Sequence, residues 1–326
     1  MASFFCSAKF FLLLLVISAV PIAYLISLET AKPTSHVYHY HSTGWFREGA
    51  KWDDLNTRFL VSFMEGGVGQ IRVPDDYSPG TVLEEVRVVT DVDLAGNASL
   101  GLVVDPPRNR LLVAIADVFG NRYGAVAAYD LTTWDRLFLT QLSGSGDGKT
   151  FADDVTVDAV GNSYITDAQG NKIWKVGVNG EFQSTITSPL FIPKEWYKNI
   201  VGLNGIVYHP NGYLVVIHTF SGNLFKVEIE KGDDVKLIEV EGGPLSFGDG
   251  LELLSPTRLV VAGNPSRLVE SSNDWETAKV IGKSKGQSHR LVTAATVKDE
   301  KVYLNHILGL GYPRRKHVLM EAVFDS

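Results

Sequence analysis

Short apolar runs separated by turn residues recur along most of the chain, and residues 151–178 show the pattern most clearly. Their sequence, FADDVTVDAVGNSYITDAQGNKIWKVGV, holds three runs rich in β-branched and aromatic residues, separated by the turns AVGN and AQGN. Gly and Asn readily adopt the positive φ angles that tight hairpins need. A fourth run, FQSTI, follows Asn179-Gly180. The pattern predicts a four-stranded antiparallel meander, which is one blade of a β-propeller.

The same pattern repeats, as a propeller requires. Residues 151–178 align without a gap with GLNGIVYHPNGYLVVIHTFSGNLFKVEI downstream and with REGAKWDDLNTRFLVSFMEGGVGQIRV upstream. Further copies are LGLVVDPPRNRLLVAIAD, FGDGLELLSPTRLVVAGNPSRLVE and VTAATVKDEKVYLNHI. The sequence therefore predicts an all-β, six-bladed β-propeller. Its blades should be about 45 to 53 residues apart and begin with residues 48–73, 99–139, 151–187, 202–240, 247–282 and 289–324.

Residues 36–46, HVYHYHSTGWF, alternate as a strand does. We expect this segment to supply a strand that closes the ring with the last blade. His39 and His41 would then share one face of the strand, where such a pair can bind a metal. The alternative is an edge strand that is simply rich in aromatic residues.

One position recurs just before the first, innermost strand of every copy. Blades surround a central channel, so the equivalent positions should form a ring that faces its axis. The six occupants are Glu48, Leu100, Asp153, Asn204, Asp249 and Thr293. Four of the six are carboxylates or amides.

Three formal negative charges in a narrow channel would repel one another and take up protons unless a cation were bound. The ring offers oxygen ligands and neither Cys nor His, so it favours calcium, with magnesium as a weaker alternative to calcium and zinc disfavoured. We expect one ion, held by Glu48, Asp153, Asn204 and Asp249. The alternative is a water-filled channel whose polar residues satisfy one another.

Composition supports a globular protein without a nucleic-acid partner. Of 326 residues, 45% are hydrophobic and 21% are charged, which is ordinary for a globular chain. The net charge is −7, and no basic block or arginine-rich stripe interrupts the sequence, which argues against nucleic-acid binding. We expect a monomer that acts on a small molecule.

The N-terminus differs from the rest of the chain. Lys9 precedes an apolar run from Phe10 to Leu28 that nearly spans a bilayer core. Residues 1–30 are therefore a cleaved signal peptide or an uncleaved single-pass anchor, and residues 36–326 form the propeller. Both alternatives place the propeller in the secretory pathway, in a lumen or outside the cell. The sequon Asn97-Ala98-Ser99 predicts a glycoprotein, and the sole cysteine, Cys6, lies before the apolar run.

Four short segments carry a family resemblance. The chain has REGAKW at residues 47–52, ADD at 152–154, LNG at 203–205 and GDG at 248–250. Over about residues 40–320 it resembles the SMP-30/gluconolactonase/LRE-like family of six-bladed, calcium-dependent lactonases and phosphotriesterases. The resemblance implies that Glu48, Asp153, Asn204 and Asp249 are calcium ligands and that Asp249 is also the catalytic carboxylate. Phe151 stands where sugar-lactone members carry arginine, which argues against an aldonolactone and for a substrate with an apolar part.

The implied reaction is metal-assisted hydrolysis of a lactone, aryl ester or phosphotriester. Asp249 would act as general base or as nucleophile, and the sequence does not separate these roles. His218 aligns with Asp167 of the preceding blade and is either a proton shuttle or a structural histidine. Asp154 and Asp117 are candidates for supporting roles near the site.

The longest insertion, residues 187–203, carries Phe191, Trp196 and Tyr197. It is expected either to pack on the propeller as an interblade loop or to form an apolar wall over the site.

Two other functions stay open. One is a strictosidine-synthase-like enzyme, which resembles this fold but needs no metal and has a disulfide that this chain cannot make. The other is a non-catalytic propeller that calcium stabilises and that binds a partner. A calcium titration separates the first of these from a calcium-dependent hydrolase, and an ester and lactone panel with and without chelator separates the second.

Overall fold

The computed structural model describes residues 8–144, 146–229 and 234–325, and the chain forms two compact units, Met1–His36 and Val37–Ser326. The first unit contains helix α2 (Ala8–Thr30), which includes Pro21. Its segment Lys9–Thr30 is long and apolar enough to cross a membrane, and a signal sequence would meet the same criterion. An apolar N-terminal helix was predicted and is present.

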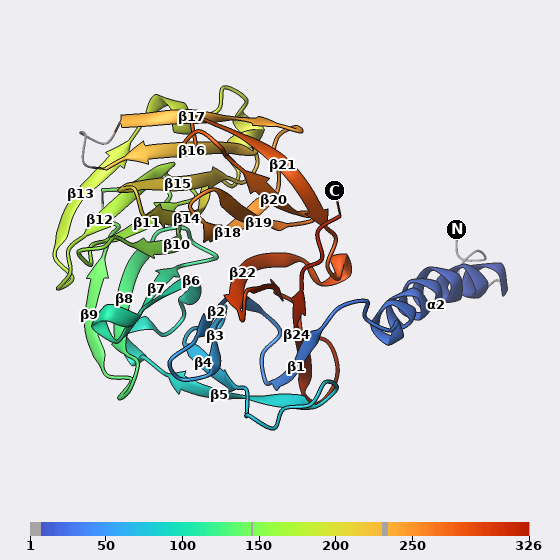
Figure 1. Ribbon diagram of the computed structural model, residues 1–326. Coiled ribbons are helices and arrows are strands. Elements are labelled where there is room, and N and C mark those ends of the chain that lie inside the picture. The colour runs from blue at the N-terminus through green and yellow to red at the C-terminus, as the bar shows by residue number, and fades with distance from the viewer. Residues whose placement is uncertain (1–7, 145, 230–233, 326) are drawn as a thin grey trace. The chain divides into compact units, whose positions relative to one another are not determined.

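The second unit consists of antiparallel groups of strands arranged as propeller blades (Figure 1). The first three groups are β2 (Arg47–Asp53), β3 (Arg58–Phe63), β4 (Val68–Arg72) and β5 (Val82–Val89); β6 (Ala98–Asp105), β7 (Arg110–Ala116), β8 (Gly124–Asp130) and β9 (Arg136–Gln141); and β10 (Ala152–Val157), β11 (Ser163–Asp167), β12 (Lys172–Val176) and β13 (Phe182–Thr187).

The remaining groups follow the same order along the chain. They are β14 (Leu203–His209), β15 (Tyr213–His218), β16 (Asn223–Glu228) and β17 (Asp234–Glu241); β18 (Gly248–Ser255), β19 (Arg258–Gly263), β20 (Ser266–Glu270) and β21 (Thr277–Ser284); and β22 (Val292–Lys298), β23 (Lys301–His306) and β24 (Arg315–Glu321). Short 3-10 helices lie at Val92–Leu94, Pro106–Arg108, Pro189–Phe191, Trp196–Asn199 and Ser288–Arg290.

The first strand of the second unit completes its last group. Strand β1 (Val37–Ser42) pairs antiparallel with β24, from Val37 opposite Met320 to Ser42 opposite Arg315. This confirms the predicted closing strand. Joining the first and last blades in this way removes a free sheet edge, which would otherwise expose unpaired backbone groups.

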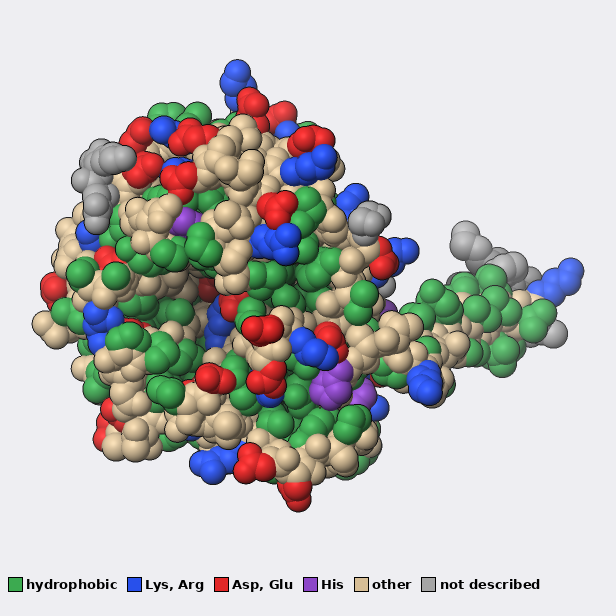
Figure 2. Space-filling model, in the orientation of Figure 1, with side chains coloured by type: hydrophobic (Ala, Val, Ile, Leu, Met, Phe, Trp, Pro, Cys, Tyr) green, Lys and Arg blue, Asp and Glu red, His purple; other side chains and the backbone are tan. Residues whose placement is uncertain are grey.

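The first strand of each group is the innermost one. These strands contact one another in a closed cycle, in the order β2, β6, β10, β14, β18, β22 and again β2. A closed cycle of inner strands encloses a central channel, and all the inner strands run along it in the same sense. In the view of Figure 2 the middle of this unit is hollowed, with charged and hydrophobic side chains beside one another in the hollow.

Apolar clusters fill the space between neighbouring blades. In one of them Leu112 and Ala114 of β7 pack with Ile165 and Trp174 of the next blade. In another, Trp275 packs among residues of the two blades around it. Because each blade is covered by a neighbour, the second strand of most blades is buried on both faces, as in β3, β7, β11 and β15, and this explains the near-continuous apolar runs there.

Candidate functional site

The repeat-equivalent polar residues lie on the inner strands. Each is the second residue of its strand, except Leu100, which is the third. The prediction that they lie just before the strands is wrong, because strand pairing begins one or two residues before each ring residue. The strands and their ring residues are β2 with Glu48, β6 with Leu100, β10 with Asp153, β14 with Asn204, β18 with Asp249 and β22 with Thr293.

A bulge marks the ring position in every blade. Pairing between the first and second strand changes register between Arg47 and Ala50, Ser99 and Leu102, Ala152 and Val155, Leu203 and Ile206, Gly248 and Leu251, and Val292 and Ala294. A bulge leaves a residue unpaired and changes the direction of nearby side chains. The same irregularity therefore recurs where each ring residue leaves its strand.

Close packing of the inner strands explains why the residue after the ring position is small. It is Gly or Ala in every blade except one, where it is Asp154. A Cβ added to Gly205 would lie 2.3 Å from the carbonyl oxygen of Asp249 in the next blade. A Cβ added to Gly101 would lie 2.8 Å from the carbonyl oxygen of Asp153. Small residues at this position let neighbouring inner strands approach and keep the channel narrow.

Burial and neighbouring acids raise the pKa of the ring acids. Burial, followed by the charges of Asp249, Asp153 and Asp154, raises the pKa of Glu48 well above its usual range. Burial and the charges of Asp249, Asp154 and Asp167 do the same for Asp153. Burial raises the pKa of Asp249 to about 7, although a hydrogen bond with Asn204 opposes this rise. These carboxylates therefore converge on a space that disfavours their negative charge.

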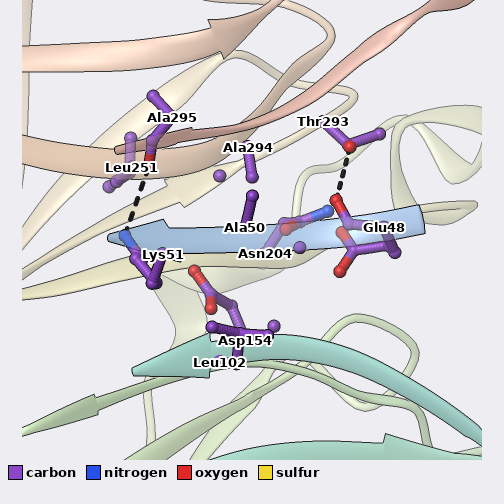
Figure 3. A pocket seen from close by; sticks show the side chains of 13 residues that line it. Glu48, Ala50, Lys51, Leu102, Asp154, Asn204, Leu251, Thr293, Ala294 and Ala295 are labelled. Atoms are coloured by element: carbon purple, nitrogen blue, oxygen red, sulfur yellow. Dashed lines mark hydrogen bonds between the residues drawn. The ribbon is translucent and has the colours of Figure 1, made fainter. Parts of the chain in front are cut away.

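Glu48 has an unused acceptor in this space. Its Oε2 atom is buried and has no hydrogen-bond partner among the described residues. Its carbonyl oxygen accepts a hydrogen bond from Thr293 Oγ1 at 2.6 Å (Figure 3) and another from Asn305 Nδ2 at 2.9 Å. The neighbours thus hold the backbone of Glu48 in place and leave part of the carboxylate without a donor.

A second charged layer lies three residues further along the inner strands. Lys51 Nζ pairs with Glu252 Oε2 and also donates to the carbonyl oxygen of Ala295 at 3.3 Å. Figure 3 shows Lys51 and Glu48 at opposite ends of one stretch of β2, with Asp154 facing the space between them. Lys51 and Glu252 were not predicted as site residues. Each stands three residues after a ring residue, Glu48 and Asp249 respectively, so comparing that position across the repeats identifies both.

Asp154 links the two layers. Its carboxylate accepts backbone hydrogen bonds from Val155 at 2.8 Å and from Ile206 at 3.2 Å. Burial raises its pKa to about 6, while the charge of Lys51 and the two backbone donors act in the opposite direction. Asp154 thus fastens the third blade to the fourth, and its carboxylate lines the channel.

A small cavity lies between the layers. It has a volume of about 20 Å³, and its lining includes Glu48, Lys51, Asp154, Asn204 and Thr293. About 10–15 Å³ is enough for one water-sized occupant, so the cavity has room for a water or an ion and not for a substrate. A substrate would have to approach the ring from the end where the inner strands begin.

His218 is buried and only partly satisfied. Its Nδ1 lies 3.4 Å from the backbone nitrogen of Ser221, and its Nε2 has no hydrogen-bond partner among the described residues. Burial lowers the pKa of His218 to about 4, so its imidazole is neutral at pH 7. The residue pairs in register with Leu203, which precedes the ring residue Asn204.

Asp167 and Asp117 have turn-capping roles. Asp167 Oδ1 accepts from the backbone nitrogens of Phe151 at 2.8 Å and Gly170 at 2.8 Å. Asp117 Oδ1 accepts from the backbone nitrogen of Gly120 at 2.8 Å. These bonds fix two turns of the chain, and the charge of Asp167 also contributes to the raised pKa of Asp153.

The donor set suits a hard cation, although the side chains are not gathered tightly. Among the described residues, no three His, Cys, Asp or Glu side chains form a ready-made metal cluster. Three observations nevertheless fit a cation: the convergence of Glu48, Asp153 and Asp249, the unpartnered Oε2 of Glu48, and the oxygen-only ligands. Asn204 adds a neutral donor beside Asp249.

Two other candidate segments have structural contacts. His41 Nδ1 lies 3.3 Å from Glu84 Oε1 at the surface. Phe191 is buried and meets Phe225 edge to face at 5.2 Å, whereas Trp196 is 78% exposed. The 187–203 insertion is therefore anchored by Phe191 and presents Trp196 to solvent.

Comparisons with solved structures support the propeller fold. A catalytically inactive variant of virginiamycin B lyase from Staphylococcus aureus, with quinupristin, superposes with a TM-score of 0.53 at 9% identity, covering 87% of this chain and 99% of that one. The structure of U3-55K gives a TM-score of 0.59 at 6% identity, covering 89% and 100%. The RRP9 WD40 repeats give 0.55 at 8% identity, covering 85% and 78%. At such identities the likeness concerns the fold alone.

No family model matches the chain, and no curated protein matches it. The resemblance to the lactonase and phosphotriesterase family therefore stays a hypothesis that depends on the four short motifs.

Proposed function

We propose that residues 36–326 form a six-bladed propeller and that it is a calcium-dependent hydrolase of lactones, aryl esters or phosphotriesters. The observation that carries the proposal is the placement of Glu48, Asp153 and Asp249 at equivalent positions of the inner strands, at one end of the channel. Burial raises the pKa of all three, and the charge of Asp249 further raises the pKa of Glu48 and Asp153. Acids so arranged are stabilised by a cation and are costly without one.

Glu48, Asp153, Asn204 and Asp249 would hold the ion. Oxygen donors alone favour calcium, which accepts six to eight ligands and tolerates irregular geometry, over magnesium, which demands a near-octahedral set. When bound, the ion would polarise a carbonyl or phosphoryl oxygen of the substrate. The ring provides at most four side chains, so open positions would remain for water and substrate.

Asp249 is the best candidate for the reacting carboxylate. It is only half-buried, and its flanking residues, Gly248 and Gly250, add little bulk around it. Burial raises the pKa of Asp249 to about 7, where a carboxylate can accept a proton from water. It would act as base toward water or as nucleophile toward the substrate. His218 stays a candidate proton shuttle because its Nε2 has no hydrogen-bond partner among the described residues, but burial lowers its pKa to about 4 and makes it a weak base.

An ester and lactone panel with and without chelator tests this function. We expect turnover of at least one substrate with calcium and its loss with chelator. Asp249→Asn keeps the size of the side chain and an oxygen donor, and should lower turnover by roughly 10²–10⁴-fold, as for the loss of a general base. Asp76→Asn, in an exposed turn between β4 and β5 on the outer part of the first blade, is the control. Wild-type turnover by Asp249→Asn would contradict the assignment.

A non-catalytic binding module is the second candidate. The RRP9 WD40 repeats share the propeller fold, so the fold alone is as compatible with this alternative as with an enzyme. Calcium binding without hydrolysis of any member of the panel would favour this alternative, whereas hydrolysis that chelator does not affect would favour a metal-independent enzyme.

We further propose that the chain enters the secretory pathway through residues 10–28. The apolar helix supports this, and the sequon at Asn97 precedes β6 directly. Because Ser99 of the sequon is buried and its Oγ accepts from Gly67 N at 3.0 Å, the glycan would be added before the propeller folds. Unchanged gel mobility of Asn97→Gln would argue against the glycan, and release by alkaline carbonate would argue against an anchor.

A further inference from the structure

An open cleft lies at the end of the propeller where the ring residues stand. Its walls come from the segment before β2, the turn after β3, the segment before β6 and the loop after β7. Arg47 at the start of β2 pairs with Phe63 at the end of β3, and Ala98 pairs with Ala116 in the same way. All four walls therefore lie at one end of the strands, and it is the end that carries Glu48 and Leu100.

The cleft is large and mainly apolar. Its volume is about 640 Å³, within the range of small-molecule sites, and its apolar lining comprises Trp45, Phe46, Met64, Val118 and Phe119. Phe119 is 97% exposed. A ligand that covers these exposed aromatic side chains removes apolar surface from water, which is favourable. The cleft therefore favours an apolar occupant.

The charged groups in the cleft compensate each other. Arg87 donates to the carbonyl oxygen of Gly66 at 2.8 Å and lies 4.0 Å from Glu65. Glu65 also receives a hydrogen bond from Arg47 at 2.9 Å. Because one cation and one anion line the cleft and each has a partner, it offers no unpaired charge to an ionic ligand. An uncharged occupant fits best.

The cleft adjoins the ring at Leu100, the one apolar residue among the six ring residues. Leu100 packs with Ala98 and Ala116, and Met64 and Val118 pack against this cluster. Met64 and Val118 also line the cleft. Four of the six ring residues therefore carry a carboxylate or an amide. The cleft opens on the side of the ring where Leu100 lies.

We propose that this cleft binds the uncharged apolar body, an alkyl chain or an aryl group, of the substrate whose ester, lactone or phosphotriester group reacts at the ring. The inference rests on the proposed function for the identity of the reacting group, but the binding of an apolar body by the cleft is measurable without any turnover.

The first experiment measures binding of N-phenyl-1-naphthylamine, an uncharged fluorescent aromatic amine, to the full chain with Asn97→Gln, because Asn97 lines the cleft and a glycan on it would obstruct the probe. Phe119→Glu places a charge in the cleft at an exposed position that folding tolerates, and Thr43→Trp fills the cleft from another wall. Phe182→Glu, on the outer strand β13 and 51% exposed, is the matched control. We expect saturable fluorescence enhancement that both cleft variants weaken about tenfold and that Phe182→Glu does not change.

Equal probe binding by the wild type and both cleft variants would overturn the inference, and so would the absence of saturable binding. Sedimentation of the same proteins tests another occupant of the cleft. A wild-type dimer that Phe119→Glu converts to a monomer would show that a second copy covers the cleft, and would also overturn the inference.

The second experiment links the cleft to turnover. The ratio of kcat/KM for a p-nitrophenyl decanoate over p-nitrophenyl acetate should fall about tenfold in Phe119→Glu relative to Phe182→Glu, because the longer chain loses its apolar contacts. An unchanged ratio in an active enzyme would contradict binding of the substrate in the cleft and would leave the proposed hydrolase function unaffected. Probe binding that the cleft variants weaken, in a protein with no activity, would support the cleft and contradict the hydrolase.

Discussion

Lys51 and Glu252 form an ion pair inside the central channel, although they are 201 positions apart in the sequence. Their side chains are 21% and 19% exposed, so both are largely removed from water. The charges of Glu252 and Asp154 raise the pKa of Lys51 although burial lowers it. The pair joins the first and fifth blades beneath the acidic ring and offsets part of its charge.

Removing one partner of this pair should destabilise the propeller. Lys51→Met leaves Glu252 and Asp154 without their cation, and we expect the free energy of unfolding to fall by about 3 kcal/mol. The double variant Lys51→Met, Glu252→Met removes both charges and should lose less than Lys51→Met alone. Denaturant titrations at pH 7 give these values. Equal stability of Lys51→Met and the wild type would show that the pair does not hold the blades together.

The close approach of the inner strands makes Gly101 intolerant of a side chain. A Cβ added there would lie 2.5 Å from the Cα of Asp154. Because that neighbour is backbone, relief requires movement of an inner strand, and Gly101→Ala should cost about 1–3 kcal/mol. Nothing lies within 4 Å of a Cβ added to Gly148, so Gly148→Ala is the control, with a change of at most about 0.5 kcal/mol. The same loss in both variants would refute the packing argument.

His317 should make stability depend on pH. It stacks on Tyr40 at 5.2 Å, and its Nε2 lies 3.0 Å from the carbonyl oxygen of Gly44. Burial, with smaller contributions from Arg47 and Arg290, lowers its pKa to about 3. Below about pH 6.5 the imidazole is protonated in the unfolded chain but stays neutral in the folded chain. Protonation therefore favours the unfolded chain, and the free energy of unfolding falls as pH drops below about 6.5.

The measurement is denaturant unfolding of the wild type and His317→Gln between pH 7 and pH 5. The stability difference between the two proteins should shift against the wild type by about 2 kcal/mol over this range. Comparison with a variant is needed because acids with a raised pKa, such as Asp154, gain stability as pH falls and oppose the effect. Parallel pH profiles would contradict a buried neutral His317.

The fold was largely predictable because the repeat is strong. Glycine and asparagine turns between β-branched runs located the strands to within a few residues, and the alternation in residues 37–42 predicted the closing strand. The same repeat aligned Glu48, Asp153, Asn204 and Asp249 at equivalent positions of the inner strands. These features follow from local periodicity, which a single sequence displays.

Other features depend on contacts between distant segments. The pairing of Lys51 with Glu252 requires two inner strands to face each other across the channel, and the sequence marks these residues only by their spacing from Glu48 and Asp249. The cleft between residues 43–46 and 118–119 requires the geometry of four separate loops. His218 could be placed near Asn204 from the alignment, but its unpartnered Nε2 depends on how the surrounding side chains pack.

Calorimetric titration of the full chain with calcium tests the acidic ring most directly. Glu48→Gln keeps the shape of the side chain and removes its charge, and Glu241→Gln, whose side chain is 73% exposed, is the matched control. We predict one calcium ion per wild-type chain, the same affinity in Glu241→Gln, and at least about tenfold weaker binding in Glu48→Gln, a loss of about 1.4 kcal/mol. No calcium binding by the folded wild type, or equal affinity in Glu48→Gln, would contradict the account.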